Sequence, residues 1–174
     1  QKELLSGGID LAIAAYPKAP PSIELADYYT EHTVLCLVDS LLVQCQIDLD
    51  VRRNEIAAGD LHSLRDCPFV LGSAADIGGR IGRELLRASG ISPISKATSE
   101  NVETLLALCV QGVGACFCPE NLLHTALSPE QLAHLHILPL CPEASYPICF
   151  GYLSRSYPWS VLSEFIRIAR EQTA

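Results

Sequence analysis

The sequence predicts an α/β fold, in which short buried strands alternate with amphipathic helices. Short apolar runs recur along the chain, among them residues 9–14, 69–71 and 115–118, and each has the length of a buried strand. Helical periodicity follows several of these runs, most clearly over residues 98–112. Glycine or proline separates the two kinds of segment. This alternation of strands and helices is typical of an α/β protein.

The clearest pattern is in residues 98–119. Ser99, or Thr98 before it, is expected to cap a helix, because hydroxyl side chains accept from the free N–H groups of a first turn. The helix would bury an apolar stripe made of Val102, Leu105, Leu106, Cys109 and Val110. Gly112 would end it, and Gly114 would allow a close turn into a strand at 115–118. Pro119 is expected to open a further helix.

The segments before this pattern are expected to form strands at 9–14, 23–28, 33–38 and 69–71, whereas residues 39–59 carry no clear pattern. Asp60 is expected to cap a short turn at 61–64. A helix is predicted over 76–89, with an apolar face made of Ile77, Ile81, Leu85 and Ala88. Gly78, Gly79 and Gly82 weaken its first turns, so tight packing or a nearby ligand would explain them.

The segments after it are expected to include strands at 135–140 and 146–153, and a strand near 91–97 precedes the pattern. A final helix, which Pro158 would open, carries an apolar stripe made of Val161, Leu162, Phe165, Ile166 and Ala169.

Composition and charge restrict the function. The net charge of -8 and the scattered basic residues argue against nucleic-acid binding by this segment, since phosphate binding needs clustered Lys and Arg. No apolar run approaches the roughly 20 residues that span a bilayer. The eight cysteines lie mostly in apolar segments, which favours reduced, buried thiols in a cytoplasmic protein. The sequence has no methionine and opens like the end of a helix, so we expect it to be part of a longer protein.

The sequence carries no motif of a catalytic, nucleotide or metal site. Ser73 follows Gly72 but precedes two alanines, so it forms no G-x-S-x-G nucleophile elbow, and no H-E-x-x-H occurs. The glycines of 72–82 form neither a P-loop, which needs a Lys followed by Ser or Thr, nor the G-x-G-x-x-G pattern of dinucleotide-binding proteins. Cys116 and Cys118 could bind a metal together with His134 and His136, but their spacing lacks C-x-x-C. We therefore expect no enzyme, no cofactor and no metal, and redox sensing by a cysteine pair is a minor alternative.

Three motifs in order resemble the effector-binding domain of LysR-type transcriptional regulators. Besides 98–119, residues 4–13 look like the family's "L-x-x-G-x-hydrophobic-D-hydrophobic-A-hydrophobic" pattern, and Asp60-Leu61 followed by 67–70 looks like its "D-L … P-F-I" pattern. The resemblance implies a two-lobed, periplasmic-binding-protein-like (type II) fold with an effector cleft between the lobes. The first lobe would comprise 1–66, N-terminally incomplete, the second lobe 67–142, and 143–174 would return to the first. The crossings would fall near 65–68 and 141–146.

The resemblance also implies a function. The chain would be an effector-binding regulatory domain that senses a small anionic metabolite and couples it to the arrangement of a DNA-bound oligomer. A homodimer or homotetramer is implied, with the 76–89 helix in the interface. DNA would be bound by an N-terminal winged helix-turn-helix domain that this sequence lacks. A solute-binding protein of a transport system, which could share the two-lobed fold, and an enzyme on the same scaffold are the alternatives.

The ligand-binding candidates lie in two loops and one tyrosine. Thr98 and Ser99 line the effector cleft in the family pattern, although a simple helix cap is an equally good interpretation. The loop after strand 69–71 lies where open α/β sheets bind ligands, and its candidates are Gly72, Ser73, Ala74, Ile77 and Gly78. Arg80 and Arg83 could meet an anion, but ion pairs on the helix surface are the favoured role. Tyr16 matches a family position at the cleft mouth on the first lobe, and an exposed loop tyrosine is the alternative interpretation.

Overall fold

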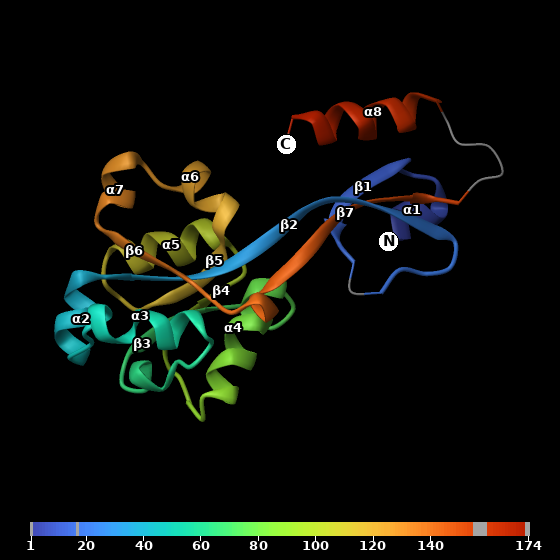
Figure 1. The fold of residues 1–174 in the computed structure, drawn as a ribbon. Coiled ribbons are helices and arrows are strands. Elements are labelled where there is room, and N and C mark those ends of the chain that lie inside the picture. Colours follow the sequence, from blue (N-terminus) through green and yellow to red (C-terminus); the bar gives the residue numbers. More distant parts are fainter. Residues whose placement is uncertain (1, 17, 155–159, 173–174) are drawn as a thin grey trace. The chain divides into compact units, whose positions relative to one another are not determined.

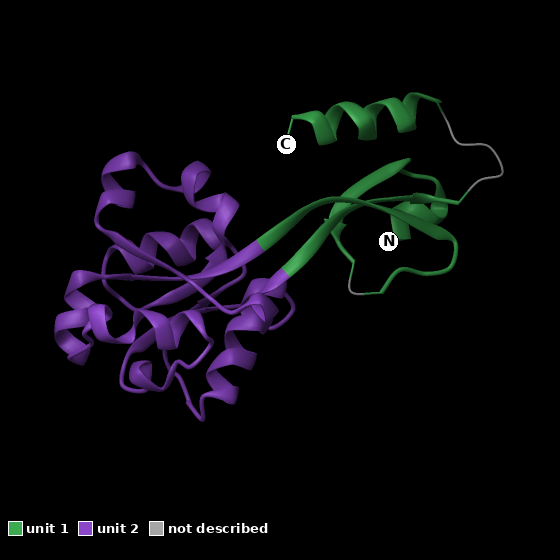
Figure 2. Cartoon of the chain, viewed as in Figure 1, with its two compact units in different colours: residues 1–31, 146–174 green, residues 32–145 purple. Residues whose placement is uncertain are grey.

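The computed structural model describes residues 2–16, 18–154 and 160–172. The chain forms two compact units, unit 1 from residues 1–31 and 146–174 and unit 2 from residues 32–145 (Figure 2). Strands and helices alternate along the chain (Figure 1), which confirms the predicted α/β fold. No helix of the described part is long and apolar enough to cross a membrane.

Unit 1 is a small antiparallel sheet with a helix at each end of its sequence. Its elements are α1 (Lys2–Ser6), β1 (Leu11–Ala15), the first half of β2 (Ile23–Val38), most of β7 (Ser145–Leu153) and α8 (Ser160–Glu171). The strand order is β1-β7-β2, and Leu11 lies opposite Tyr152. The ring of Phe150 lies 4.5 Å from that of Tyr28 and 6.3 Å from that of Phe165, between ring centroids. Phe150 is fully buried, so these aromatic contacts surround one core residue of the unit.

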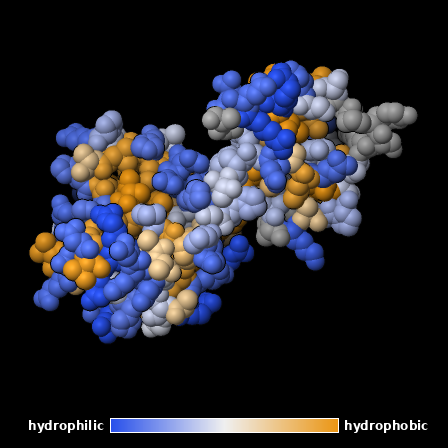
Figure 3. Space-filling view, viewed as in Figure 1, coloured by the Kyte–Doolittle hydropathy of each residue, from blue (hydrophilic) through white to orange (hydrophobic). Residues whose placement is uncertain are grey.

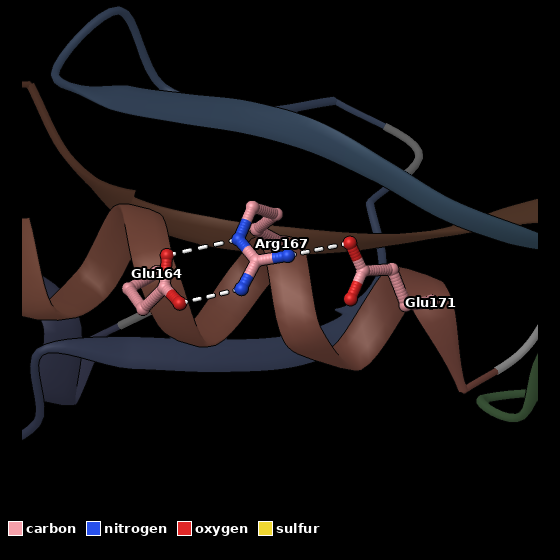
Figure 4. A network of polar contacts seen from close by, with 3 residues as sticks. All are labelled: Glu164, Arg167 and Glu171. Carbon is pink, nitrogen blue, oxygen red and sulfur yellow. Dashed lines mark hydrogen bonds and ion pairs between the residues drawn. The ribbon is translucent and has the colours of Figure 1, made fainter.

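Helix α8 is tied to the sheet of unit 1 by one arginine. Arg170 donates from Nε to the backbone carbonyl of Asp27 at 2.7 Å. Arg167 bridges Glu164 and Glu171 along the helix surface (Figure 4), and ion pairs this exposed add little stability. Of the predicted apolar stripe Ile166 is buried, whereas Val161 is 77% exposed. Pro158, predicted to open this helix, lies outside the described residues.

Unit 2 is built on five strands, three of them parallel. These strands are β3 (Pro68–Gly72), β4 (Ile94–Ser99), β5 (Cys116–Pro119), β6 (Leu135–Pro139) and the second half of β2. β3 and β4 are parallel, and a parallel bridge between Phe69 and Ala115 links β3 to β5. β2 runs antiparallel to both β5 and β6. The spatial order is therefore β4-β3-β5-β2-β6.

The helices of unit 2 are mostly short. They are α2 (Asp39–Cys45), α3 (Leu49–Ala57), α4 (Ile77–Ala88), α5 (Val102–Val110), α6 (Leu123–Ala126) and α7 (Pro129–Ala133), with 3-10 turns at His62–Leu64, Glu120–Leu122 and Pro142–Ala144. α2 and α3 occupy the region where the sequence showed no pattern. Local features at their ends, and not hydrophobic periodicity, define these two helices. Gln46 takes a left-handed φ of 54° after α2, and the Asp48 side chain caps α3.

Two predictions on the first third of the chain are corrected by β2. One continuous strand, Ile23–Val38, replaces the two predicted at 23–28 and 33–38, because the polar residues between them stay extended. The chain passes between the units at 31/32 and at 145/146. Residues 32–66, predicted in the first lobe, therefore belong to unit 2, since Val34–Val38 pair with β5 and β6 and are buried there.

All eight cysteines are free thiols and seven are buried. In unit 2 the Sγ atoms of Cys36 and Cys118 lie 3.6 Å apart, and Cys109 donates to the backbone carbonyl of Cys36. Contacts with the neighbouring thiols, together with burial, raise the pKa of Cys116 well above its usual value. These thiols pack as small apolar groups. In the described ranges no set of three or more His, Cys, Asp or Glu side chains could hold a metal ion, and His136 bonds to Asp39 at 2.6 Å.

Candidate functional site

The parallel strands of unit 2 all end at one edge. Gly72 at the end of β3 pairs with Ser99 at the end of β4. β5 is parallel to β3, so its last residue, Pro119, lies at the same edge, opposite Thr33 of β2. Helices α4 and α5 begin just after this edge. In open α/β sheets the carboxyl ends of the strands, with helix N-termini beside them, are the usual place for a ligand. We call it the strand-end edge.

The β3–α4 loop keeps its shape through its own side chains. Asp76 caps α4, and its Oδ2 accepts from the N–H of Gly79 at 3.0 Å. Ser73 Oγ accepts from the N–H of Ala75 at 3.2 Å. The N–H groups of Ile77 and Gly78, the first two of the helix, donate to none of the described residues. These groups carry the positive end of the helix dipole.

Close packing explains the glycines of α4. A Cβ on Gly79 would lie 2.2 Å from the carbonyl oxygen of Ser73, and a Cβ on Gly82 would lie 2.4 Å from the Phe117 ring. The helix can therefore lie directly on β3 and β5 only because these side chains are missing. The predicted apolar face is corrected accordingly. The buried face consists of the three glycines with Leu86 and Ile81, while Ile77 and Leu85 are half-buried and Ala88 is exposed.

Thr98 and Ser99 lie at the strand-end edge, but neither caps a helix. Both belong to β4, whose pairing with β3 holds them extended. The cap is Asn101, whose Oδ1 accepts from the N–H of Thr104 at 2.9 Å. Asn is as good a cap as Ser, so composition alone could not choose between them. Thr98 is exposed and its hydroxyl bonds to none of the described residues, whereas Ser99 Oγ accepts from the N–H of Asn101 at 3.1 Å.

The structure brings seven of the eight predicted ligand residues together. Gly72, Ser73, Ala74, Ile77, Gly78, Thr98 and Ser99 all lie at the strand-end edge of unit 2. Pro119, predicted to open a helix, instead ends β5 and precedes a 3-10 turn. It reaches the same loop, because a Cβ on Gly78 would lie 3.9 Å from its Cδ.

Tyr16 belongs to unit 1 and packs within it. Its hydroxyl donates to the carbonyl of Ala12 at 3.5 Å, and a Cβ on Gly151 would lie 2.3 Å from that hydroxyl. Burial raises the pKa of Tyr16, and nearby Cys149 adds to the shift. Its ligand role remains a prediction.

A hollow of about 180 Å³ extends the strand-end edge beyond β5. His32 Nδ1 and Ser145 Oγ are joined across it by a hydrogen bond of 2.8 Å, and Thr33 Oγ1 is buried without a partner among the described residues. The residues around the hollow are His32, Thr33, Val34, Glu120, Pro139, Leu140 and Ser145. A second hollow, of about 450 Å³, lies beside α4 and is lined by Ile81, Glu84, Leu85 and Ala88 together with Gly59 and Cys141. Apolar side chains also reach the visible surface of both units (Figure 3).

Arg83 is the residue of this region whose favoured role, a surface ion pair, the structure does not show among the described residues. Arg80 does pair with Glu84, at 4.0 Å, but Arg83 pairs with no carboxylate of the described residues. Its Nη2 donates to the carbonyl of Gly72 at 2.7 Å, at the end of β3. The signal in the sequence is its spacing, because Arg83 follows Gly79 by four residues and so lies on the face that packs on the strands.

The family profile described as "LysR substrate binding domain" matches residues 1–174. Among solved structures, the effector-binding domain of QuiR in complex with shikimate is 17% identical with a TM-score of 0.68, covering 98% of this chain and 75% of that one. The regulatory domain of Synechocystis PCC6803 CcmR in complex with 2-PG is 12% identical with a TM-score of 0.72, covering 99% and 77%. Full-length CbnR complexed with its target DNA is 19% identical with a TM-score of 0.65, covering 98% and 55%. No curated protein sequence matches the chain.

These similarities confirm the predicted fold, that of the periplasmic-binding-protein-like domains of LysR-type regulators. The identities are low, so the likeness to solved structures shows the fold alone, and it is the profile match over all residues that shows the family. Domains of this family bind ligands within transcriptional regulators and are not enzymes. The chain belongs to the LysR substrate-binding domain family, and is the effector-binding domain of a LysR-type transcriptional regulator.

Proposed function

We propose that the strand-end edge of unit 2 binds a small anionic metabolite, and that this binding is the signal to which the regulator responds. The observation that carries the proposal is the convergence of the ends of β3, β4 and β5 with the starts of α4 and α5. This edge offers a favourable helix dipole, together with N–H groups and a Thr98 hydroxyl that bond to none of the described residues. Residues 72–74, 77–78 and 98–99 contact the ligand.

An anionic ligand suits the chemistry of this edge. Free N–H groups at the start of a helix stabilise a carboxylate or phosphate by hydrogen bonds and by the dipole. The similar domains of QuiR and CcmR were solved with shikimate and 2-PG. These ligands belong to those proteins, and they serve here as the first compounds to test.

The ligand acts by changing how subunits are arranged on DNA. It can do so only if it binds the two arrangements with unequal affinity, since equal affinity shifts no equilibrium. DNA is bound by an N-terminal domain of the regulator, consistent with the DNA complex of the similar full-length CbnR. The net charge of -8 makes this domain itself unsuited to DNA. The regulator is cytoplasmic and works as a homodimer or homotetramer.

Helix α4 contributes to the subunit interface. The helix borders the hollow of about 450 Å³, where half-buried Leu85 and exposed Ala88 lie together with Cys141. Ile81 is only 8% exposed and belongs to unit 2, so a charge there would test folding and not association. An interface substitution belongs at Ala88 instead.

The test is a thermal-shift screen with small organic and inorganic anions, shikimate included, repeated with Thr98→Val. A ligand that binds only the folded state raises Tm by mass action. At a ligand concentration of a hundred times Kd, the free energy of unfolding rises by about 2.7 kcal/mol. Thr98→Val keeps the shape and strand propensity of the side chain and removes the hydroxyl, so the ligand-free Tm should change little.

Thr30→Val is the matched control, because Thr30 is also an exposed threonine in a strand but lies in unit 1. The proposal predicts that Thr98→Val reduces the ligand-induced gain in Tm and that Thr30→Val leaves it unchanged. Equal gains in both variants, or no stabilising ligand of any charge, would contradict a site at the strand-end edge.

A further inference from the structure

Arg83 differs from every other basic side chain of the described residues. All other Lys and Arg side chains in those ranges are exposed, and Arg83 is half-buried. A cation taken partly out of water normally has a carboxylate partner, because its lost hydration must be compensated. Arg83 has none among the described residues, although Arg80, one turn earlier on the same helix, reaches Glu84.

The hydrogen bonds of the Arg83 guanidinium are incomplete. One N–H of Nη2 donates to the carbonyl of Gly72 at 2.7 Å, which holds the group at the end of β3. Nε is fully buried and has no acceptor, while Nη1 is accessible and bonds to none of the described residues. A guanidinium has five N–H donors, so most of its capacity is left over. The protein thus fixes the position of this cation without neutralising it.

The position of Arg83 connects it to the predicted ligand residues. Gly72, its hydrogen-bond partner, pairs directly with Ser99, the neighbour of Thr98. Paired strands lie about 4.8 Å apart, so an anion of a few atoms at the ends of β3 and β4 lies close to the Gly72 carbonyl that holds the guanidinium. Guanidinium groups bind carboxylate and phosphate through charge-assisted hydrogen bonds.

We infer that Arg83 is the charged anchor of the strand-end edge, and that it binds a carboxylate or phosphate group of the effector through its Nη1 and Nη2 donors. The inference rests on the proposed function and makes it more specific, since it assigns the anion to one side chain. The ligand supplies the negatively charged partner that Arg83 lacks among the described residues.

The test compares Arg83→Gln with Arg80→Gln in titrations with inorganic phosphate and with shikimate, followed by calorimetry and by thermal shift. Both changes remove one charge from α4, so a long-range loss of field affects both alike. Losing a charge-assisted hydrogen bond should weaken anion binding about tenfold to hundredfold in Arg83→Gln. Arg80→Gln should stay within about twofold, since long-range charge effects are screened by salt. Arg83→Lys, which keeps the charge but loses the planar fork, should fall between them.

Ligand-free stability separates an anchor from a structural clip. If Arg83 serves to bind the ligand, Arg83→Gln should have a ligand-free Tm close to that of the unsubstituted protein. Losing the hydrogen bond to Gly72 destabilises the fold, but removing an uncompensated charge offsets that loss. The inference is overturned if Arg83→Gln binds both anions as well as Arg80→Gln does, or if neither anion binds the unsubstituted protein. An anionic compound whose stabilising effect requires Thr98 but not Arg83 would overturn it while leaving the proposed function intact.

Discussion

Replacing Gly79 by alanine tests whether α4 lies directly on the β3–α4 loop. The added Cβ would lie 2.2 Å from the carbonyl oxygen of Ser73 and 2.8 Å from the carbonyl carbon of Gly72. Both are backbone atoms, so no side chain can turn away and the helix itself must shift. Overpacking costs about 1–3 kcal/mol, and the upper end applies here because the clash is with backbone. Alanine returns about 1 kcal/mol of helix propensity.

The net effect is a loss of about 2 kcal/mol, equivalent to a fall in Tm of about 4–8 °C for a chain of this size. The assay is thermal unfolding followed by circular dichroism, with urea unfolding as the second measure. Because the helix is pushed off the loop, Gly79→Ala should also weaken any ligand bound at the strand-end edge.

Gly78→Ala is the matched control, one residue away in the same turn. Its Cβ would lie 3.3 Å from Asp76 Oδ2 and 3.9 Å from Pro119 Cδ, contacts that a small side-chain shift relieves. Its stability should therefore stay within about 1 kcal/mol of the starting protein. The reasoning is refuted if Gly79→Ala proves as stable as Gly78→Ala.

Two further substitutions test the start of α5 and the buried thiols. Asn101→Ala removes the acceptor for the Thr104 N–H and should lower the free energy of unfolding by about 1 kcal/mol, measured by urea unfolding. Ser99→Ala should cost less, because Asn101 and not Ser99 caps the helix. Burial, followed by the proximity of Cys45, raises the pKa of Cys67 from 9.0 to about 12. The folded state then holds this proton more tightly than the unfolded state does, so the contribution is complete below pH 9.0 and is lost towards about pH 12. Between about pH 9 and pH 12 the free energy of unfolding should therefore fall less in Cys67→Ala than in the starting protein. An equal fall in the two proteins over this pH range would count against the raised pKa of Cys67.

Periodicity and turn residues predicted several elements of unit 2, but not α2, α3 or the topology. The strands at 69–71 and 115–118 and the helix at 76–89 were found within about two residues of their predicted ends, because their signals are local. Gly112 takes a φ of +73°, as its predicted role at a helix end requires. The continuity of β2 was not predictable in this way. Polar residues such as Glu31 and His32 look like a break, and only long-range pairing shows that the strand continues.

The candidate site was predictable in place but not in detail. The position of residues 72–78 between a strand and a helix, and the resemblance of residues 98–99 to the LysR-type pattern, gave the ligand candidates, and the structure brings them together at one edge. The capping residue was misassigned because Ser99 and Asn101 have the same intrinsic preference, and only the pairing of β4 with β3 decides between them. Arg80 and Arg83 look equivalent in sequence. They differ because Arg83 lies on the face of α4 that packs on the strands, whereas Arg80 is exposed. Tertiary packing determines which face of the helix is buried.

The most direct test of a ligand site at the strand-end edge is nuclear magnetic resonance of the backbone amides, recorded while the anion that stabilises the domain most is titrated in. A bound ligand changes the surroundings of the N–H groups it contacts. A ligand at the strand-end edge should produce saturable shifts concentrated in residues 72–79 and 98–101, and Arg83→Gln should need a much higher anion concentration to reach them. Saturable shifts confined to unit 1, or to parts of unit 2 away from the strand-end edge, would contradict a site there.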